Sequence, residues 1–594
     1  MAGASGIARF AARLERWLEG KAARVALSLA FSLVLCLFLA LCVSPTNSDD
    51  DWSVALYLSG RVDGQGLSLF LNALLSQAIF ALNNLAPALN WFFVLEHATA
   101  FAAFAALTYG ALSYVRRCPG LVMLGFLALY LLPQCISTSN YTVVAFLATC
   151  AGGFMLVGRM GDEMAGMPSA VTAVALAGLG LMWRFQMFLV GVPFVGIAWL
   201  WRLYGMGRAG LSGGTAWARV VAPAVCVFVA CGGLFAYDHV TWQQDGWREW
   251  SAYNAPRTIT SDYPMPDYAE AADELRAMSV SENDYWMIRN WANADADVLD
   301  TDAMTQVASL RSPLPGVGEA AGDALDYVKS CVRRWKFFAF PVVVVLLLGP
   351  RDRRGYAIAA LELLLACAVC VYYVLIERLI DRVEDPTWGY ALCMCVVLSL
   401  PRAAAASGVA RGRHVRRGSS AVPGLPGVAL TFVGPVVLAG MVALLVRANL
   451  PMLNVPAFAA TFGQTSYVAD APITAYIQGH PDNAYVIESG LHTRFEREYE
   501  LRYLPAAELA ERVMPLGGWG SGSPFRKAQS EARGATNPVG ALVADGNTLL
   551  IADAGTADHV LTFLREHYDP AIAMESVEPL PFLGEGVSVW KFTM

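Results

Sequence analysis

Charged side chains are scarce in this chain, since they make up 15% of its 594 residues whereas hydrophobic residues make up 56%. Soluble domains carry about 25% charged residues, so this composition excludes one or two ordinary soluble domains and indicates a polytopic membrane protein. The net charge is only −7, and no soluble segment has a basic patch with interleaved aromatic residues. The chain therefore lacks the electrostatic footprint of a nucleic-acid-binding protein.

Several chemical signatures are also missing. No H-E-x-x-H, P-loop or G-x-G-x-x-G pattern occurs, so nothing supports a nucleotide-dependent cytoplasmic reaction. The 12 cysteines lie mostly in apolar runs, where they act as small hydrophobic residues. None follows Leu450, which excludes a disulfide framework in the C-terminal region.

The chain does contain a series of long apolar runs. A hydropathy window predicts about eleven membrane-spanning helices, and the first run is too long for a cleaved signal peptide. The expected spans are 24–44, 87–115, 119–136, 140–158, 168–183, 185–203, 217–237, 335–349, 356–377, 388–404 and 425–447. The runs on either side of Arg184 are compatible with two helices or with one broken helix.

The charges between these runs predict the orientation of the chain. Alternate loops carry arginine with few acids, from Arg116 and Arg117 to the run between Arg411 and Arg417. The long loop 238–334, in contrast, has seventeen acidic and eight basic residues. By the positive-inside rule the N-terminus is cytoplasmic and this loop lies outside. We therefore expect an integral plasma-membrane protein of bacterial origin.

The expected fold is a membrane domain of α-helices, residues 1–449, followed by a small extracytoplasmic α/β domain, residues 450–594. The outer loops of the membrane domain are 45–86 and 238–334. Within the first, the run from Leu67 to Leu82 is polar on one side and predicts a helix lying in the membrane interface. In the C-terminal domain, strand-like and helix-like runs alternate. The strands are expected at 485–487, 541–544, 549–552 and 587–590, and the helices at 506–513 and 557–567.

Three consecutive aspartates, Asp49, Asp50 and Asp51, follow the first apolar run directly. A carboxylate is costly inside hydrocarbon but well placed just outside it, where it can remove a proton or hold a divalent cation. The alternative is a solvated acidic turn that keeps the first loop outside. The position between an apolar helix and an interfacial run favours a catalytic role.

Arginines occupy two of the expected outer turns. Arg378 and Arg382 lie four residues apart and share one face if their segment is helical, and Arg184 lies in a turn of one or two residues. Arginine is well suited to gripping a phosphate at the membrane surface. The alternative for Arg378 and Arg382 is local pairing with the acids around them, which are Glu377, Asp381, Glu384 and Asp385.

The loop 238–334 is rich in tryptophan, tyrosine and aspartate. Aromatic faces stack on the apolar faces of sugars, and neighbouring carboxylates bind sugar hydroxyls. The candidate residues for binding a sugar or an acceptor are Trp247, Arg248, Tyr253, Asp262 and Tyr263. The alternative is that these aromatic residues belong to the interfacial belt or to a local core.

Taken together, the acidic motif after the first span, the interfacial run, the many further spans and the outer C-terminal domain resemble the C-type (GT-C fold) membrane glycosyltransferases. The resemblance implies a polyprenyl-phosphate-linked sugar as donor and inversion at the transferred carbon. It also implies that Asp49, Asp50 or Asp51 is the general base or a metal ligand. Members of the family differ in metal dependence, so a divalent cation held by this triplet is the candidate cofactor.

The sequence therefore predicts a glycosyltransferase of the membrane that moves a sugar from a polyprenyl-phosphate lipid to a glycan, lipid or protein acceptor outside. Asp50 or Asp51 would deprotonate the acceptor, and the arginines would neutralise the leaving phosphate. One alternative is a transporter or flippase of a lipid-linked or glycan substrate, although few charges in the spans argue against ion coupling. The other is a non-catalytic assembly protein of the cell envelope.

Overall fold

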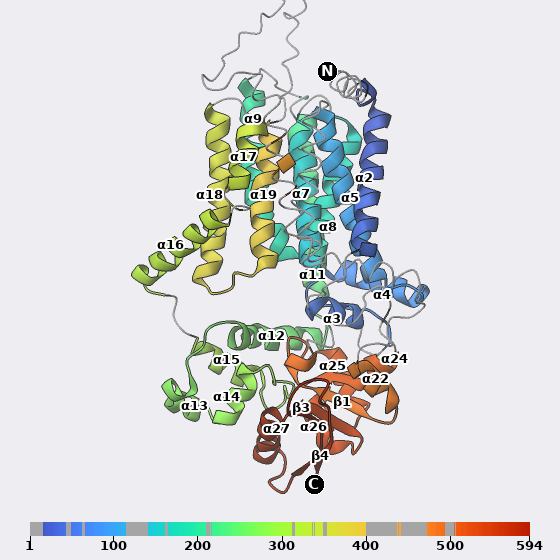
Figure 1. Cartoon of the computed structure of the whole chain (residues 1–594), viewed down its shortest axis with the longest axis vertical. Coiled ribbons are helices and arrows are strands. Elements are labelled where there is room, and N and C mark those ends of the chain that lie inside the picture. Colours follow the sequence, from blue (N-terminus) through green and yellow to red (C-terminus); the bar gives the residue numbers. More distant parts are fainter. Residues whose placement is uncertain are drawn as a thin grey trace, which may run out of the picture.

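The computed structural model describes residues 16–42, 49–61, 66–114, 140–160, 164–208, 217–311, 315–334, 339–348, 353–399, 472–492 and 507–594, with a few isolated positions between them. The expected spans 119–136 and 425–447 lie outside these residues. In its described parts the chain is mostly helical, with one small sheet near the C-terminus. A bundle of helices forms one end of the molecule, and a cap of shorter helices and strands forms the other (Figure 1).

The bundle contains apolar helices from most of the first 400 residues. They are α2 (Lys21–Cys42), α5 (Trp91–Tyr114), α7 (Tyr141–Gly158), α8 (Met167–Trp183), α9 (Phe185–Arg208), α11 (Ala222–Thr241, preceded by the π-helical turn η2, Trp217–Val221), α17 (Ala339–Leu348), α18 (Arg353–Leu375) and α19 (Asp381–Ser399). Five of the described helices are long and apolar enough to cross a membrane, namely α5, α7, α9, η2 with α11, and α18. They match five of the expected spans, and the full count of about eleven is not confirmed.

Helix α7 lies at the centre of the bundle, and every one of its residues is buried. Asn140 begins the helix, because its side-chain oxygen accepts a hydrogen bond from the Thr142 amide at 2.6 Å. Helix α8 packs closely on α7 where glycines face it. A Cβ at Gly152 would lie only 2.7 Å from the Ala177 amide nitrogen. The first residue of α7, Tyr141, is therefore held in a fixed position at one end of the bundle.

Arg184 alone separates α8 from α9. Its backbone is extended, with φ −162° and ψ 110°, so the two runs form two helices and not one broken helix. Contacts of Arg184 and of Arg382, in the first turn of α19, with Tyr141 and its neighbours place these three turns at the same end of the bundle. This end faces the cap (Figure 1).

Two short helices lie between the bundle and the cap (Figure 1). Helix α3 (Asp49–Tyr57) begins with the aspartate triplet, and α4 (Ala73–Leu85) overlaps the run predicted to lie in the interface and extends three residues beyond it. The Asn72 side chain caps α4 by accepting from the Leu74 amide at 3.1 Å. Ser76 and Ile79 are buried, whereas Leu85 is 81% exposed. Helix α4 is thus one-sided, as its sequence predicts.

The cap draws on two distant parts of the chain. The loop 238–334 supplies α12 (Trp247–Asp262), η3 (Tyr268–Glu270), α13 (Ala272–Ala277), α14 (Glu282–Arg289) and α15 (Thr301–Ser309), and α16 (Val317–Arg333) returns to the bundle. The C-terminal region supplies α22 (Pro472–Gly479), β1 (Ala484–Ile487), α24 (Ala507–Arg512), β2 (Val513–Pro515), α25 (Pro524–Glu531), α26 (Pro538–Ala544), β3 (Thr548–Asp553), α27 (Ala554–His567), β4 (Ala573–Pro579) and β5 (Val587–Thr593). The sheet has the order β2-β1-β3-β5-β4, with β2, β1 and β3 parallel and the other pairs antiparallel.

The predicted strands at 485–487, 549–552 and 587–590 are confirmed as β1, β3 and β5. The prediction of a strand at 541–544 is wrong, because these residues belong to helix α26. Asn537 accepts a hydrogen bond from the Gly540 amide at 2.8 Å, and Pro538 occupies the first turn. This pair of helix-start signals outweighs a short apolar run that has no period of its own.

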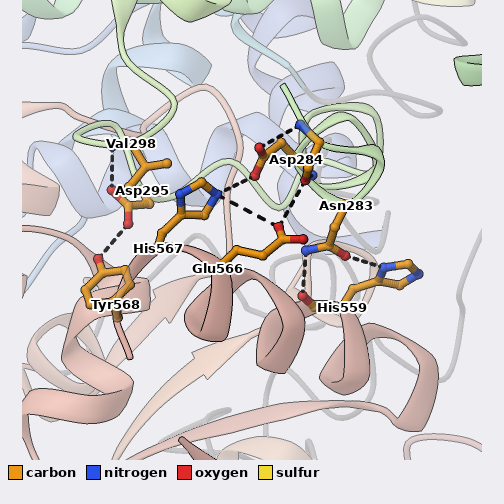
Figure 2. Close-up of polar contacts among 9 residues, drawn as sticks. Asn283, Asp284, Asp295, Val298, His559, Glu566, His567 and Tyr568 are labelled. Carbon is orange, nitrogen blue, oxygen red and sulfur yellow. Dashed lines mark hydrogen bonds and ion pairs between the residues drawn. The ribbon is translucent and has the colours of Figure 1, made fainter. Parts of the chain in front are cut away.

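The two parts of the cap share one hydrophobic core. Leu275 and Ile288 from the loop pack together with Val486, Leu550 and Phe563 from the C-terminal region. Polar contacts reinforce the junction of α14 with α27, as Figure 2 shows. The loop 238–334 and the C-terminal domain are therefore one folding unit, which a boundary at residue 450 does not reveal.

Figure 2 shows the polar contacts of this junction in detail. His567 hydrogen-bonds Asp284 at 2.8 Å, and the Tyr568 hydroxyl donates to Asp295 at 2.6 Å. Asn283 and His559 contact each other twice. The Asn283 side-chain N–H donates to the His559 carbonyl, and the Asn283 side-chain oxygen contacts Nδ1 of the His559 ring. Each of these pairs joins one residue of the loop to one of the C-terminal region.

Candidate functional site

The end of the bundle that faces the cap gathers charged residues from six segments of the chain. We call this group the arginine cluster. It consists of Asp50 and Asp51 of α3, Tyr141 of α7, Arg184 between α8 and α9, Arg257 and Asp262 of α12, Arg378 between α18 and α19, and Arg382 of α19. Phe70, Tyr263 and Trp291 supply aromatic rings beside it.

Asp50 and Arg382 form the ion pair at the centre of the cluster. Arg382 Nη1 lies 2.8 Å from Asp50 Oδ2, and the two side chains are only 28% and 14% exposed. The same carboxylate oxygen accepts a hydrogen bond from the Tyr141 hydroxyl at 3.2 Å. Burial lowers the pKa of the Arg382 guanidinium, but the charge and hydrogen bond of Asp50 together with Tyr141 and Asp51 outweigh this effect, and the pKa lies above its usual value. Arg382 is thus a permanent positive charge next to a candidate base.

Arg184 extends this network by one step. Its Nη1 donates to the Tyr141 hydroxyl at 2.6 Å, and its guanidinium carbon lies 5.0 Å from the ring centre of Phe70 and 5.1 Å from that of Tyr141. The two rings are stacked on each other at 5.3 Å. Tyr141 therefore connects Asp50 to Arg184, and an oxyanion bound there would meet guanidinium groups on two sides.

The other members of the aspartate triplet differ from Asp50. Asp51 is fully buried, and its Oδ1 lies 3.5 Å from the Tyr141 amide nitrogen as a hydrogen-bond acceptor. Asp49 belongs to α3, but its side chain lies outside the described residues. Glu96 in α5 is buried with neither carboxyl oxygen hydrogen-bonded within the described residues, and it interacts electrostatically with Asp51. Asp50 is thus a described carboxylate of the triplet that pairs directly with an arginine of the cluster.

A second ion pair lies on the cap side of the cluster. Arg378 Nη1 lies 2.6 Å from Asp262 Oδ2, and its guanidinium covers the ring of Tyr263 at 4.9 Å. Arg311 covers the same ring at 4.0 Å. Asp262 and Tyr263 were predicted to bind a sugar or acceptor, and the structure brings both of them to the predicted phosphate-binding residue Arg378.

Arg257 is the most buried arginine of the cluster, with 2% exposure. Its Nε donates to Asn254 at 3.0 Å and its Nη2 to Thr258 at 3.0 Å, but its buried Nη1 has no hydrogen-bond partner among the described residues. Burial lowers the pKa of this guanidinium, and the charge of Asp262 opposes the shift. A buried N–H group left without an acceptor costs about 1–3 kcal/mol. Such a group is a candidate ligand for an anion.

Three predicted binding residues do not line the cluster. Trp247 is buried against Trp242, with ring centres 5.3 Å apart. Tyr253 is buried, and its hydroxyl donates to the Asn293 carbonyl at 3.2 Å. Arg248 is exposed and pairs with the adjacent Glu249 at 2.8 Å. Trp247 and Tyr253 therefore pack in the interior, as the alternative of a local core predicts, and Arg248 lies at the surface.

The sequence reasoning missed several residues of the site. Tyr141 and Phe70 lie in apolar runs that were assigned to a span and to the interfacial segment, and no local pattern distinguishes them from packing residues. Arg257 is one of the few basic residues of the acidic loop 238–334. Its position within an aromatic and acidic segment is the only feature of the sequence that indicates a role in the site.

A possible metal-binding group lies away from the cluster. Ligand atoms of Asp284, Glu566 and His567 lie within 4.8 Å of one another, and this is the only such group in the described residues. Asp284 and His567 already hydrogen-bond each other, however (Figure 2), and Glu566 accepts a hydrogen bond from the Ser281 hydroxyl at 3.0 Å. The arrangement is that of a polar clasp between α14 and α27.

Comparison with known proteins adds no identification. No protein-family model matches the chain, and neither a curated protein nor a solved structure does. The function is therefore inferred from the residues of the arginine cluster.

Proposed function

We propose that this protein is a membrane glycosyltransferase that moves a sugar from a polyprenyl-phosphate donor to an acceptor on the outer side. The observation that carries the proposal is the network of Asp50, Tyr141, Arg184 and Arg382. Three of these residues were selected from the sequence as base and phosphate ligands, and they come from segments more than 100 residues apart. Their convergence at one end of an apolar bundle supports a shared chemical role.

In the proposed reaction Arg184 and Arg382 hold the donor phosphate. The polyprenyl tail stays in the lipid beside the bundle, so only the headgroup needs to reach the cluster. The bond between the sugar C1 and the phosphate oxygen breaks while C1 bonds to the acceptor oxygen, and the acceptor proton passes to the Asp50 carboxylate. The leaving polyprenyl phosphate gains one negative charge, which the guanidinium groups stabilise. A single displacement of this kind inverts the configuration at C1.

Binding of the donor phosphate would also change the Asp50–Arg382 ion pair. A phosphate that binds Arg382 competes with Asp50 for the same guanidinium, and this exchange leaves the carboxylate available to the acceptor hydroxyl. Arg257 and Arg378 then add positive charge from the cap side. A divalent cation would bind at Asp50 and Asp51, and its role would be to neutralise the leaving phosphate.

The decisive test is transfer from a panel of synthetic polyprenyl-phosphate sugars by membranes that contain the protein. The Asp50→Asn, Asp51→Asn double variant should lose more than about 100-fold in transfer rate, as is typical when a general base is removed. Asp273→Asn is the matched control, because the Asp273 side chain is 95% exposed and pairs with Arg276. Transfer that survives in the double variant would refute the assignment of the base.

A second measurement separates an enzyme from the transporter alternative. Wild-type protein in vesicles should convert the donor to free polyprenyl phosphate only when an acceptor is present. Movement of an intact polyprenyl-phosphate sugar across the bilayer, unchanged in the double variant, would favour a flippase instead.

A further inference from the structure

A glycine-rich loop of the C-terminal domain, residues 517–523, reaches the bundle at the arginine cluster. The Gly518 amide donates to Asn293 Oδ1 at 3.1 Å, and the Tyr57 hydroxyl and Ser523 Oγ lie 2.9 Å apart. The loop therefore contacts both the cap segment that follows α14 and the end of α3. It joins the three parts of the molecule that surround the cluster.

Close contacts explain why this loop contains glycine. A Cβ at Gly517 would lie 2.1 Å from the Trp291 carbonyl oxygen, and one at Gly520 would lie 2.3 Å from the Tyr57 hydroxyl. Gly518 has φ +109° and Gly522 φ +70°, which other residues rarely adopt. The backbone is held firmly on two sides, so the one large side chain of the loop, Trp519, has a defined position.

Trp519 lies between two aromatic rings of the site. Its ring centre is 5.2 Å from that of Tyr57 and 4.9 Å from that of Phe70, which it meets edge to face. Trp519 is half-buried, and its indole N–H has no hydrogen-bond partner among the described residues. It thus combines an apolar ring with an unused donor, and these are the two groups needed to bind a sugar ring with its hydroxyls.

The position of Trp519 relative to the arginines is as informative as its chemistry. Phe70 contacts both groups, because its ring centre lies 4.9 Å from that of Trp519 and 5.0 Å from the Arg184 guanidinium carbon. A sugar ring attached to a phosphate on Arg184 is comparable in size to one of these distances. Such a sugar is therefore long enough to reach from the phosphate toward Trp519.

We propose that Trp519 is a carbohydrate-stacking residue that holds the sugar carried by the donor phosphate. The ring face of the sugar packs on the indole, and a sugar hydroxyl accepts the indole N–H. This inference rests on the proposed function and deepens it, because it assigns recognition of the transferred sugar to the C-terminal domain and recognition of the phosphate to the bundle. The substrate class is then a lipid phosphate whose sugar presents an apolar face.

The test compares binding of two probes to purified full-length protein in detergent, a sugar-free polyprenyl phosphate and a panel of polyprenyl-phosphate sugars. In wild type, at least one sugar should strengthen binding over the sugar-free lipid. Trp519→Ala should remove this gain, roughly tenfold, and leave the sugar-free lipid within about twofold of wild type. Trp519→Phe keeps a ring and should restore part of the gain. Phe582→Ala is the control, because Phe582 is an exposed aromatic residue (40%) of the same domain.

The other outcomes each have one meaning. If wild type binds neither probe, the proposed function and this inference both fail. If wild type binds the lipid and Trp519→Ala weakens both probes equally, only the inference fails, and Trp519 serves to dock the domain. If Trp519→Ala leaves donor binding intact but raises the KM for the acceptor, the stacked sugar belongs to the acceptor and the assignment to the donor is wrong.

Discussion

Substitution of two arginines of the cluster should affect stability differently and ligand binding alike. Arg257 and Arg382 are both partly or fully buried beside Asp50, but Arg382 is paired with a carboxylate and Arg257 leaves its Nη1 without an acceptor. Methionine keeps the length and apolar stem of arginine and removes the charge. The effect on folding and the effect on ligand binding can therefore be separated.

For Arg382→Met the expected change is a loss of stability. Breaking a fully buried ion pair by removing one partner costs about 3–5 kcal/mol, whereas an exposed pair is worth about 0–1 kcal/mol. The side chains of Arg382 and Asp50 are 28% and 14% exposed, so we expect about 1–3 kcal/mol. The Asp50 carboxylate would keep the Tyr141 hydroxyl as a donor, which limits the loss.

For Arg257→Met the expected change is close to zero. The substitution removes two hydrogen bonds, to Asn254 and Thr258, and a contact with the Trp291 ring at 5.2 Å. It also removes the cost of a buried charge with an unpaired N–H, which is about 1–3 kcal/mol for the N–H alone. Replacing buried charges by apolar residues is often neutral or stabilising. The net change in the free energy of unfolding should lie within about 1 kcal/mol of zero.

Ligand binding should fall in both variants. A hydrogen bond to a charged group contributes about 1.5–3 kcal/mol, so each substitution should weaken binding of polyprenyl phosphate roughly tenfold to 100-fold. Thermal unfolding in detergent reports stability, and equilibrium binding of the lipid phosphate reports affinity. Arg276→Met is the control, because Arg276 is 65% exposed in a pair with Asp273. Arg257→Met protein that is strongly destabilised but binds the lipid normally would show that Arg257 is a structural residue.

Three further predictions concern the cap and its junction with the bundle. The hydrogen bond to Asp284 raises the pKa of His567 above its usual 6.5, so its stabilising effect is full below that pH and is lost as the pH rises through the folded pKa. Protection factors for amide hydrogen exchange in α14 and α27, corrected for the intrinsic base-catalysed rate, should therefore fall as the pH rises above 6.5, and Asp284→Asn should abolish this fall. Gly520→Ala places a Cβ against the Tyr57 hydroxyl and should lower both thermal stability and transfer, whereas Gly546→Ala, with nothing within 4 Å, should change neither. Arg334→Gln removes a two-point ion pair with Glu384, at 2.8 and 2.6 Å, and should lower the melting temperature. An unchanged melting temperature for this variant would show that the pair contributes little to the anchoring of α19.

The sequence predicted that Asp50, Arg184 and Arg382 lie at the same end of the bundle, but it did not predict every residue of the cluster. Asp50, Arg184 and Arg382 each follow or precede an apolar run, so a consistent count of chain reversals was enough to place them at one end of the bundle. Arg257 and Trp519 lie in the two outer segments, whose contact depends on a core shared across more than 150 residues of sequence. No local sequence pattern predicts that contact, because nothing within either segment indicates that it packs against the other.

The errors in the cap have the same origin. The run 541–544 is apolar and short, and only the preceding Asn537 and Pro538 decide that it is a helix. Trp247 and Tyr253 were grouped as binding residues because aromatic residues are frequent there, but Trp247 packs in the core that includes the bundle and Tyr253 in the core of the cap. Strand β4 was missed because most of its residues are exposed and its apolar alternation is weak.

The common core of the cap also constrains how this protein is made. Leu275 and Ile288 leave the ribosome long before Val486 and Phe563, and in the proposed topology the helices α17, α18 and α19 must enter the bilayer between these two events. In that topology the apolar side of the loop 238–334 stays uncovered until the C-terminal region has also crossed the membrane. A truncated chain that ends after α19 would keep this surface exposed to chaperones and proteases.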